Sequence, residues 1–121
     1  MAVAKHFPGL GRVDRDPHFH LPQILVDKRE IEEVNLPPFR KAIEEGVSAL
    51  MTSHAIYPAI DNDRPATMSR DVLTHLIRDE MAFKGLIITD DLEMAGDSQT
   101  VGCRERGIGR FRGGCRYIID M

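Results

Sequence analysis

The sequence lacks most features that would assign it to a specialised class of protein. No apolar run approaches the roughly 18 residues that a membrane span requires. The formal net charge of −3 gives no reason to expect a nucleic acid or a membrane surface as a partner. Two cysteines occur among 121 residues, without a CxxC or other metal-binding spacing. No basic region followed by an apolar segment opens the chain, so we expect a cytoplasmic protein of ordinary globular composition.

Three short apolar runs predict buried strands, at residues 2–7, 47–51 and 86–89. Segments with helical spacing lie between them, so the order is strand, helix, strand, helix, strand. This alternation predicts an α/β fold with parallel strands and both faces of the sheet covered. In such folds the chemistry takes place at the carboxyl ends of the strands.

The two helical segments differ in regularity. In residues 27–46, Ile31 and Val34 are expected to share one face, two prolines interrupt, and a glycine ends the helix. The second helix is expected to begin at Ser69 as its N-cap. Its apolar face is formed by residues at helical spacing: Val72, Leu73, Leu76, Ile77 and Met81.

Titratable residues lie at the carboxyl end of each predicted strand: Lys5 and His6 at the first, His54 at the second, and Asp90 with Asp91 at the third. Each has an ordinary alternative, because Asp is a favoured helix N-cap and a Lys-His pair alone indicates little. Three strands that all end in such residues nevertheless favour an active site at the carboxyl ends of the strands.

The segment between the first strand and the first helix, KHFPGLGRVDRDPHFHLP, is too rich in Gly and Pro for a helix. It carries Asp16 two residues before His18, a spacing at which a carboxylate can orient an imidazole as a general acid and base. The alternative is a solvated loop in which the two groups do not touch. The histidines lack the i, i+4 or Cys-paired spacing of a zinc site, so no metal is expected.

Five motifs in order give the chain a specific resemblance: KHFPGLG, the Asp-x-His loop, LPPFRKAIEEGVSALMTSH, PATMS and FKGLIITDDLEM. Together they resemble glycoside hydrolase family three, and within it the β-N-acetylhexosaminidase branch. The resemblance covers about three quarters of the chain. It implies a partial (β/α)8 TIM barrel, with the motifs on about strands five to seven and their helices.

The resemblance also implies a role for each candidate residue. Asp90 matches the nucleophile that forms a covalent glycosyl-enzyme, and His18 matches the acid/base, oriented by Asp16. Residues matching sugar-binding or pocket positions are Lys5, His6 and His54. The implied substrates are carbohydrates with terminal β-linked N-acetylglucosamine, and the implied enzyme uses no cofactor.

Two positions depart from the family pattern without removing a catalytic group. Leu10 stands where many members have His, and Pro17 stands between the dyad residues where many have Ser. Because proline stiffens the backbone and lacks the N–H donor, we expect slower protonation of the leaving group.

The expected domain organisation is a barrel fragment at residues 1–94 and an irregular, Gly/Arg-rich tail at 95–121. A complete barrel needs about 250 residues and eight strands. We therefore expect a fragment that is neither stable nor active alone, whose partner would be the missing part of the barrel. The tail can be read as a disordered basic segment or as a frameshifted one.

Two alternatives to an N-acetylglucosaminidase stay open at this point. One is a β-glucosidase-type member of the same family, against which the Asp-x-His loop argues. The other is a non-catalytic remnant of a barrel.

Overall fold

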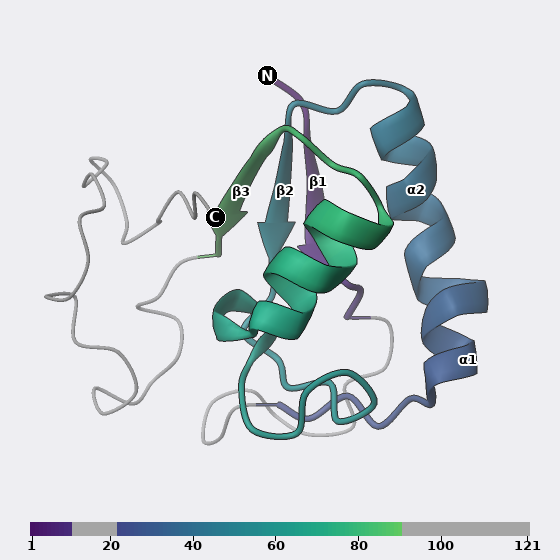
Figure 1. The fold of residues 1–121 in the computed structure, drawn as a ribbon, viewed down its shortest axis with the longest axis vertical. Helices are drawn as coiled ribbons and strands as arrows, with labels where there is room; N and C mark the ends of the chain where they lie inside the picture. Colours follow the sequence, from purple (N-terminus) through teal and green to yellow (C-terminus); the bar gives the residue numbers. More distant parts are fainter. Residues whose placement is uncertain (11–21, 91–121) are drawn as a thin grey trace, which may run out of the picture.

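The computed structural model describes residues 1–10 and 22–90, and within them a parallel three-stranded sheet (Figure 1). The strands are β1 (Val3–Phe7), β2 (Ala49–Thr52) and β3 (Leu86–Thr89), in the order β1-β2-β3. Ala49 of β2 pairs with Val3 on one side and with Leu86 on the other. The three predicted strands and their parallel arrangement are confirmed.

The helical residues between β1 and β2 form one continuous stretch. It consists of α1 (Lys28–Glu30), the π-helical turn η1 (Ile31–Asn35) and α2 (Leu36–Glu44). The predicted interruption at the prolines is wrong, because the helical stretch continues through them: they stand at the start of α2, directly after the π-helical turn.

The predicted apolar face of this segment is wrong at one position. Ile31 is buried, whereas Val34 is 62% exposed. The π-helical turn explains the difference, because the N–H of Leu36 bonds to the carbonyl of Ile31 five residues earlier. This wider turn brings Leu36, which is fully buried, onto the face that contains Ile31.

The end of α2 has the hydrogen bonds of a Schellman motif. The N–H of Gly46 bonds to the carbonyl of Ile43 at 3.0 Å, and the N–H of Val47 bonds to that of Ala42 at 3.0 Å. Gly46 has a φ of +80°, which suits glycine. The predicted stop at Gly46 is therefore confirmed.

The second helical segment is η3 (Asp71–Glu80), preceded by the 3₁₀ turn η2 (Ala66–Met68). Ser69 Oγ accepts the N–H of Val72 at 3.3 Å and donates to Asp61 Oδ2 at 2.7 Å. Ser69 thus caps the first turn, as predicted, and the whole predicted apolar face of this helix is buried. The Ser69 hydroxyl is the largest cause of a lowered pKa at Asp61.

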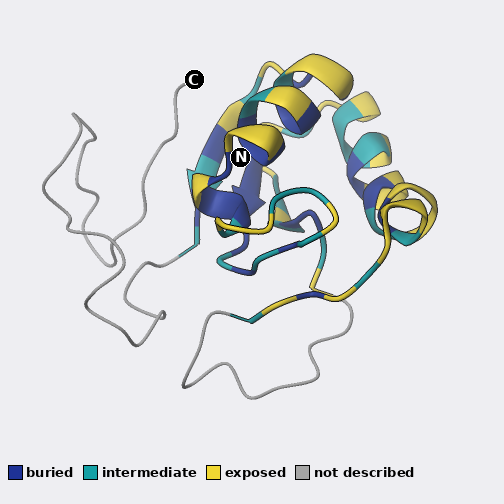
Figure 2. Cartoon of the chain, turned by 60° about the horizontal axis from the view of Figure 1, so that its bottom comes forward, coloured by how far each residue is buried: buried dark blue, intermediate teal, exposed yellow. Residues whose placement is uncertain are grey.

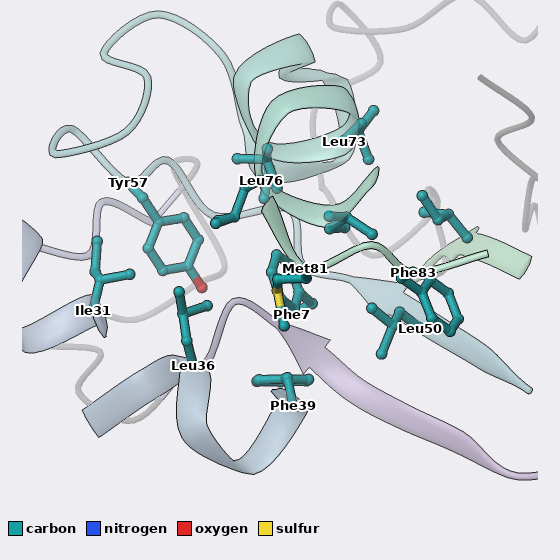
Figure 3. Packing of buried hydrophobic residues seen from close by; sticks show 14 of the residues in the cluster. Phe7, Ile31, Leu36, Phe39, Leu50, Tyr57, Leu73, Leu76, Met81 and Phe83 are labelled. Carbon is teal, nitrogen blue, oxygen red and sulfur yellow. The ribbon is translucent and has the colours of Figure 1, made fainter. Parts of the chain in front are cut away.

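Both helical segments pack on a single core. Figure 2 shows exposed residues on the outer sides of the helices and buried residues on the sides that face the sheet. In Figure 3, Phe7 lies between Leu76 on one side and Phe39 on the other, and the Phe7 and Phe39 rings meet edge to face at 4.9 Å. Leu50 of β2 and Ile87 of β3 belong to the same core cluster, so one core joins sheet and helices.

Arg78 ties η3 to the start of β3. Its Nη1 donates to the carbonyl oxygens of Phe83 at 2.9 Å and Gly85 at 2.7 Å. The guanidinium also lies 5.8 Å from the centre of the Phe83 ring. These contacts fix the turn that leads into β3 and so the position of the residues at its far end.

The loop residues Asp16 and His18 and the tail at 95–121 lie outside the described residues. Within the described ranges, no helix combines the length and apolar character that crossing a bilayer requires.

Candidate active site

The carboxyl ends of the three parallel strands lie at one edge of the sheet (Figure 1), and two of the predicted site residues meet there. His6 Nε2 lies 3.1 Å from Asp90 Oδ2, with side chains 27% and 24% exposed. Hydrogen bonds across the sheet set this geometry, because the N–H of Asp90 bonds to the carbonyl of Thr52 at 3.2 Å. The sequence predicted both residues for this edge but did not predict their pairing.

Lys5 and His54 are placed differently from this pair. Lys5 is exposed in β1, where its backbone pairs with β2, and its side chain makes no hydrogen bond or ion pair with another described residue. His54 lies two residues beyond β2, partly buried, and its Nδ1 is 3.0 Å from the hydroxyl oxygen of Thr67. The two predicted catalytic residues of the loop, His18 and Asp16, lie outside the described ranges.

A buried hydroxyl network surrounds the end of β2. Thr67 Oγ1 donates to the carbonyl of Ser53 at 2.8 Å and lies 3.1 Å from Thr52 Oγ1. Thr52 Oγ1 also lies 3.3 Å from the carbonyl oxygen of Ile88 in β3. All of the buried side-chain polar atoms of the described residues have a hydrogen-bond partner, so this edge is polar without an unsatisfied group.

Tyr57 connects this network to the segment after β1. Its hydroxyl donates to the carbonyl of Gly9 at 2.7 Å and lies 3.1 Å from Ser53 Oγ. The ring is 1% exposed, and this burial raises the pKa of Tyr57 to about 12, against a smaller lowering by the Ser53 hydrogen bond. Tyr57 is therefore a neutral donor at neutral pH.

Two consecutive residues hold both flanks of the segment at 11–21. Tyr57 binds Gly9 on its amino-terminal side. On the carboxyl-terminal side, the N–H of Ile56 bonds to the carbonyl of Pro22 at 2.9 Å, and the N–H of Ile24 bonds to the carbonyl of Ile56 at 2.8 Å. The chain that follows β2 thus fixes where the Asp-x-His segment leaves the sheet and where it returns.

Thr67 and Tyr57 belong to the site but were not predicted from the sequence. Thr67 stands in the PATMS motif and Tyr57 follows the TSH residues at the end of β2, and nothing in the sequence around them indicates their partners. As for metals, the described parts of the chain contain no group of three His, Cys, Asp or Glu side chains that could hold an ion.

The sequence profile described as the glycosyl hydrolase family 3 N terminal domain matches residues 1–119. The chain belongs to glycosyl hydrolase family 3. Among curated proteins it is similar to the beta-hexosaminidase of Neisseria meningitidis serogroup B, 39% identical over 118 residues, which are 98% of this chain and 32% of that protein. The beta-hexosaminidase of Nitrosospira multiformis is 40% identical, over 98% of this chain and 34% of its own length. The chain thus spans about a third of these relatives.

Solved structures of the same family share the fold. The family 3 β-N-acetylglucosaminidase of Paenibacillus sp. str. FPU-7 matches with a TM-score of 0.73 and 41% identity, over 77% of this chain and 18% of that chain. NagZ of Neisseria gonorrhoeae, solved in complex with N-trifluoroacetyl-D-glucosamine, matches with a TM-score of 0.69 and 41% identity, over 74% and 26%. The α/β arrangement of this chain is therefore that of part of the family's N-terminal domain.

Proposed function

We propose that this chain carries the catalytic edge of a retaining glycoside hydrolase that removes terminal β-linked N-acetylglucosamine from carbohydrates. The observation that carries the proposal is the contact between His6 and Asp90 at the carboxyl ends of β1 and β3. It joins the two motifs, KHFPG and ITDD, that would bind the sugar and attack it. The identity of 39% to a named beta-hexosaminidase supports the same substrate class.

Asp90 would be the nucleophile in a two-step displacement. One carboxylate oxygen bonds to the anomeric carbon while the bond from that carbon to the leaving oxygen breaks, and His18 gives its proton to that oxygen. In the second step His18 removes a proton from water, which attacks the same carbon and releases Asp90, so the configuration is retained.

The remaining residues would position these groups. The contact of 3.1 Å between His6 Nε2 and Asp90 Oδ2 would hold the carboxylate in one orientation. Asp16 would orient His18, and sugar hydroxyls would bind Lys5, His6 and His54. By the family resemblance β1, β2 and β3 would be strands five, six and seven of the barrel, with residues 1–94 in the barrel domain.

The test supplies the rest of the barrel from a relative, since this chain spans about a third of such proteins. In NagZ of Neisseria gonorrhoeae, 41% identical, the matching part is replaced by residues 1–90 of this chain. We expect this chimera to hydrolyse 4-nitrophenyl N-acetyl-β-D-glucosaminide. Asp90→Asn should reduce kcat by at least about 10³-fold, because it removes the nucleophile.

The matched control is His75→Gln, which changes an exposed histidine on the solvent side of η3 and should leave kcat within about twofold. A folded chimera that is inactive, or an Asp90→Asn variant as active as the control, would overturn the proposal. If the chimera hydrolysed 4-nitrophenyl β-D-glucoside faster than the N-acetylglucosaminide, β-glucosides would be the substrate class instead.

A further inference from the structure

The hydroxyl of Thr67 lies where three polar atoms converge. It is 2.8 Å from the carbonyl oxygen of Ser53, 3.1 Å from Thr52 Oγ1 and 3.0 Å from His54 Nδ1. Thr67 is 6% exposed and Thr52 is fully buried, so the directions of these bonds are set within the protein.

Only one proton is available on the Thr67 hydroxyl, which decides the direction of each bond. The Ser53 carbonyl can only accept, and it makes the shortest contact, so the Thr67 proton points to it. The Thr67 oxygen must then accept at its other contacts. Because His54 Nδ1 lies 3.0 Å from that oxygen, it must be a donor and carry a proton.

We propose that Thr67 is a positioning residue of the site, whose hydroxyl holds neutral His54 in the tautomer with the proton on Nδ1. In this tautomer Nε2 has a lone pair and accepts hydrogen bonds. Histidine in solution favours the opposite tautomer, so the arrangement depends on the Thr67 acceptor.

The backbone fixes Thr67 for this purpose. Its own N–H bonds to the Ser53 carbonyl at 3.1 Å, so amide and hydroxyl share that acceptor. The adjacent N–H of Ala66 bonds to the carbonyl of Ala55 at 2.9 Å. The turn η2 is thereby held against the residues on both sides of His54, which leaves the hydroxyl little freedom to move.

The consequence for the sugar rests on the proposed function. A neutral Nε2 acceptor at this edge selects a ligand group that donates a proton, such as a sugar hydroxyl, over one that only accepts. His54 would then bind a hydroxyl of N-acetylglucosamine as the acceptor.

The tautomer can be measured directly on the chimera, in which the rest of the barrel is present. Long-range ¹H–¹⁵N correlation spectra of ¹⁵N-histidine protein, at about pH 9 where imidazoles are neutral, distinguish the protonated nitrogen of each ring. A His54→Gln variant assigns the signals. We expect Nδ1 to carry the proton in the wild type and in Thr67→Ser, which keeps the hydroxyl.

Thr67→Val removes the acceptor, and we expect the signal to move to the Nε2-protonated pattern. Thr52→Val is the matched control, since it deletes a neighbouring buried hydroxyl but leaves Thr67 bonded to Ser53, and it should keep the wild-type pattern. The inference is overturned if the wild type carries the proton on Nε2. It is also overturned if Thr67→Val keeps the Nδ1-protonated pattern. If Thr67→Val does not fold, the wild type, Thr67→Ser and Thr52→Val decide.

The spectra do not depend on turnover, so a failure of the proposed function leaves them interpretable. In the chimera, the sugar-binding part of the inference is tested separately. Thr67→Val should raise KM about tenfold, as one lost hydrogen bond would, with a smaller change in kcat. An unchanged KM beside a changed tautomer would overturn only the contact with the sugar.

Discussion

Tyr57 offers the sharpest test of how this edge of the sheet is held together. Tyr57→Phe keeps the ring in the core and removes only the hydroxyl that donates to Gly9 at 2.7 Å and contacts Ser53 at 3.1 Å. A buried group left without its partner costs about 1–3 kcal/mol, so we expect the free energy of unfolding to fall by about 2 kcal/mol. At about 4–8 °C per kcal/mol for a small domain, the Tm would drop by roughly 8–16 °C.

The assay is urea unfolding followed by circular dichroism at 222 nm, on the 121-residue chain and on the chimera, with Ser53→Ala as the comparison. Ser53→Ala removes one bond to the Tyr57 hydroxyl but keeps the bond to Gly9, so its loss should be smaller, about 1 kcal/mol. A loss below about 0.5 kcal/mol for Tyr57→Phe, or a larger one for Ser53→Ala, would refute the reasoning.

The Tyr57 hydroxyl should also make the free energy of unfolding fall in alkali. Burial raises the pKa of Tyr57 from 10.0 to about 12, so its contribution is complete below pH 10 and is lost as the pH rises from 10 through 12. Two units correspond to about 2.7 kcal/mol. Tyr57→Phe should lack this part of the alkaline loss, and equal slopes in the two proteins would contradict the assignment.

Three further changes have expected outcomes. Gly85→Ala should destabilise the chain by more than about 1 kcal/mol, because its Cβ would lie 2.6 Å from the backbone oxygen of Ser48. Gly46→Ala should cost only about 1 kcal/mol, because its Cβ would meet nothing within 4 Å and only the φ of +80° is unfavourable. A lower urea midpoint for Gly46→Ala than for Gly85→Ala would be inconsistent with this packing. The pKa of Asp61 is lowered mainly by the Ser69 hydroxyl. Its stabilisation is present above the ordinary value of 3.8 and is lost as the pH falls through the folded pKa. Asp61→Asn should flatten this acid limb in urea midpoints measured between about pH 2 and 6, and an unchanged limb would rule out this role.

The elements that could be predicted from the sequence are those that local patterns determine. The three apolar runs became β1, β2 and β3, and η3 buries the whole predicted apolar face although its hydrogen bonds are π-helical. Val34 was predicted wrongly because it lies inside the π-helical turn η1, whose hydrogen bond from Leu36 to Ile31 spans five residues, so that Leu36 takes the place expected of Val34 on the buried face.

The residues of the candidate site were likewise predictable only where the topology of the sheet places them. The parallel βα pattern sufficed to place His6 and Asp90 at one edge, because strand ends in such a sheet are set by topology. Tyr57 could not be predicted, since its partner Gly9 lies 48 residues away and a hydroxyl shows no preference for a distant carbonyl in the sequence. Thr67, 13 residues from His54, is hidden for the same reason.

The bonds of Ile56 and Tyr57 to Pro22 and Gly9 have a consequence for substitutions in the segment between these two flanks. Both attachment points are set by the chain after β2 and do not depend on which residues run between them. The strand ends therefore keep their register whichever side chains stand between the two flanks. A substitution among residues 11–21, His18 included, should change the chemistry of the site and leave the pairing of β1 with β2 as it is.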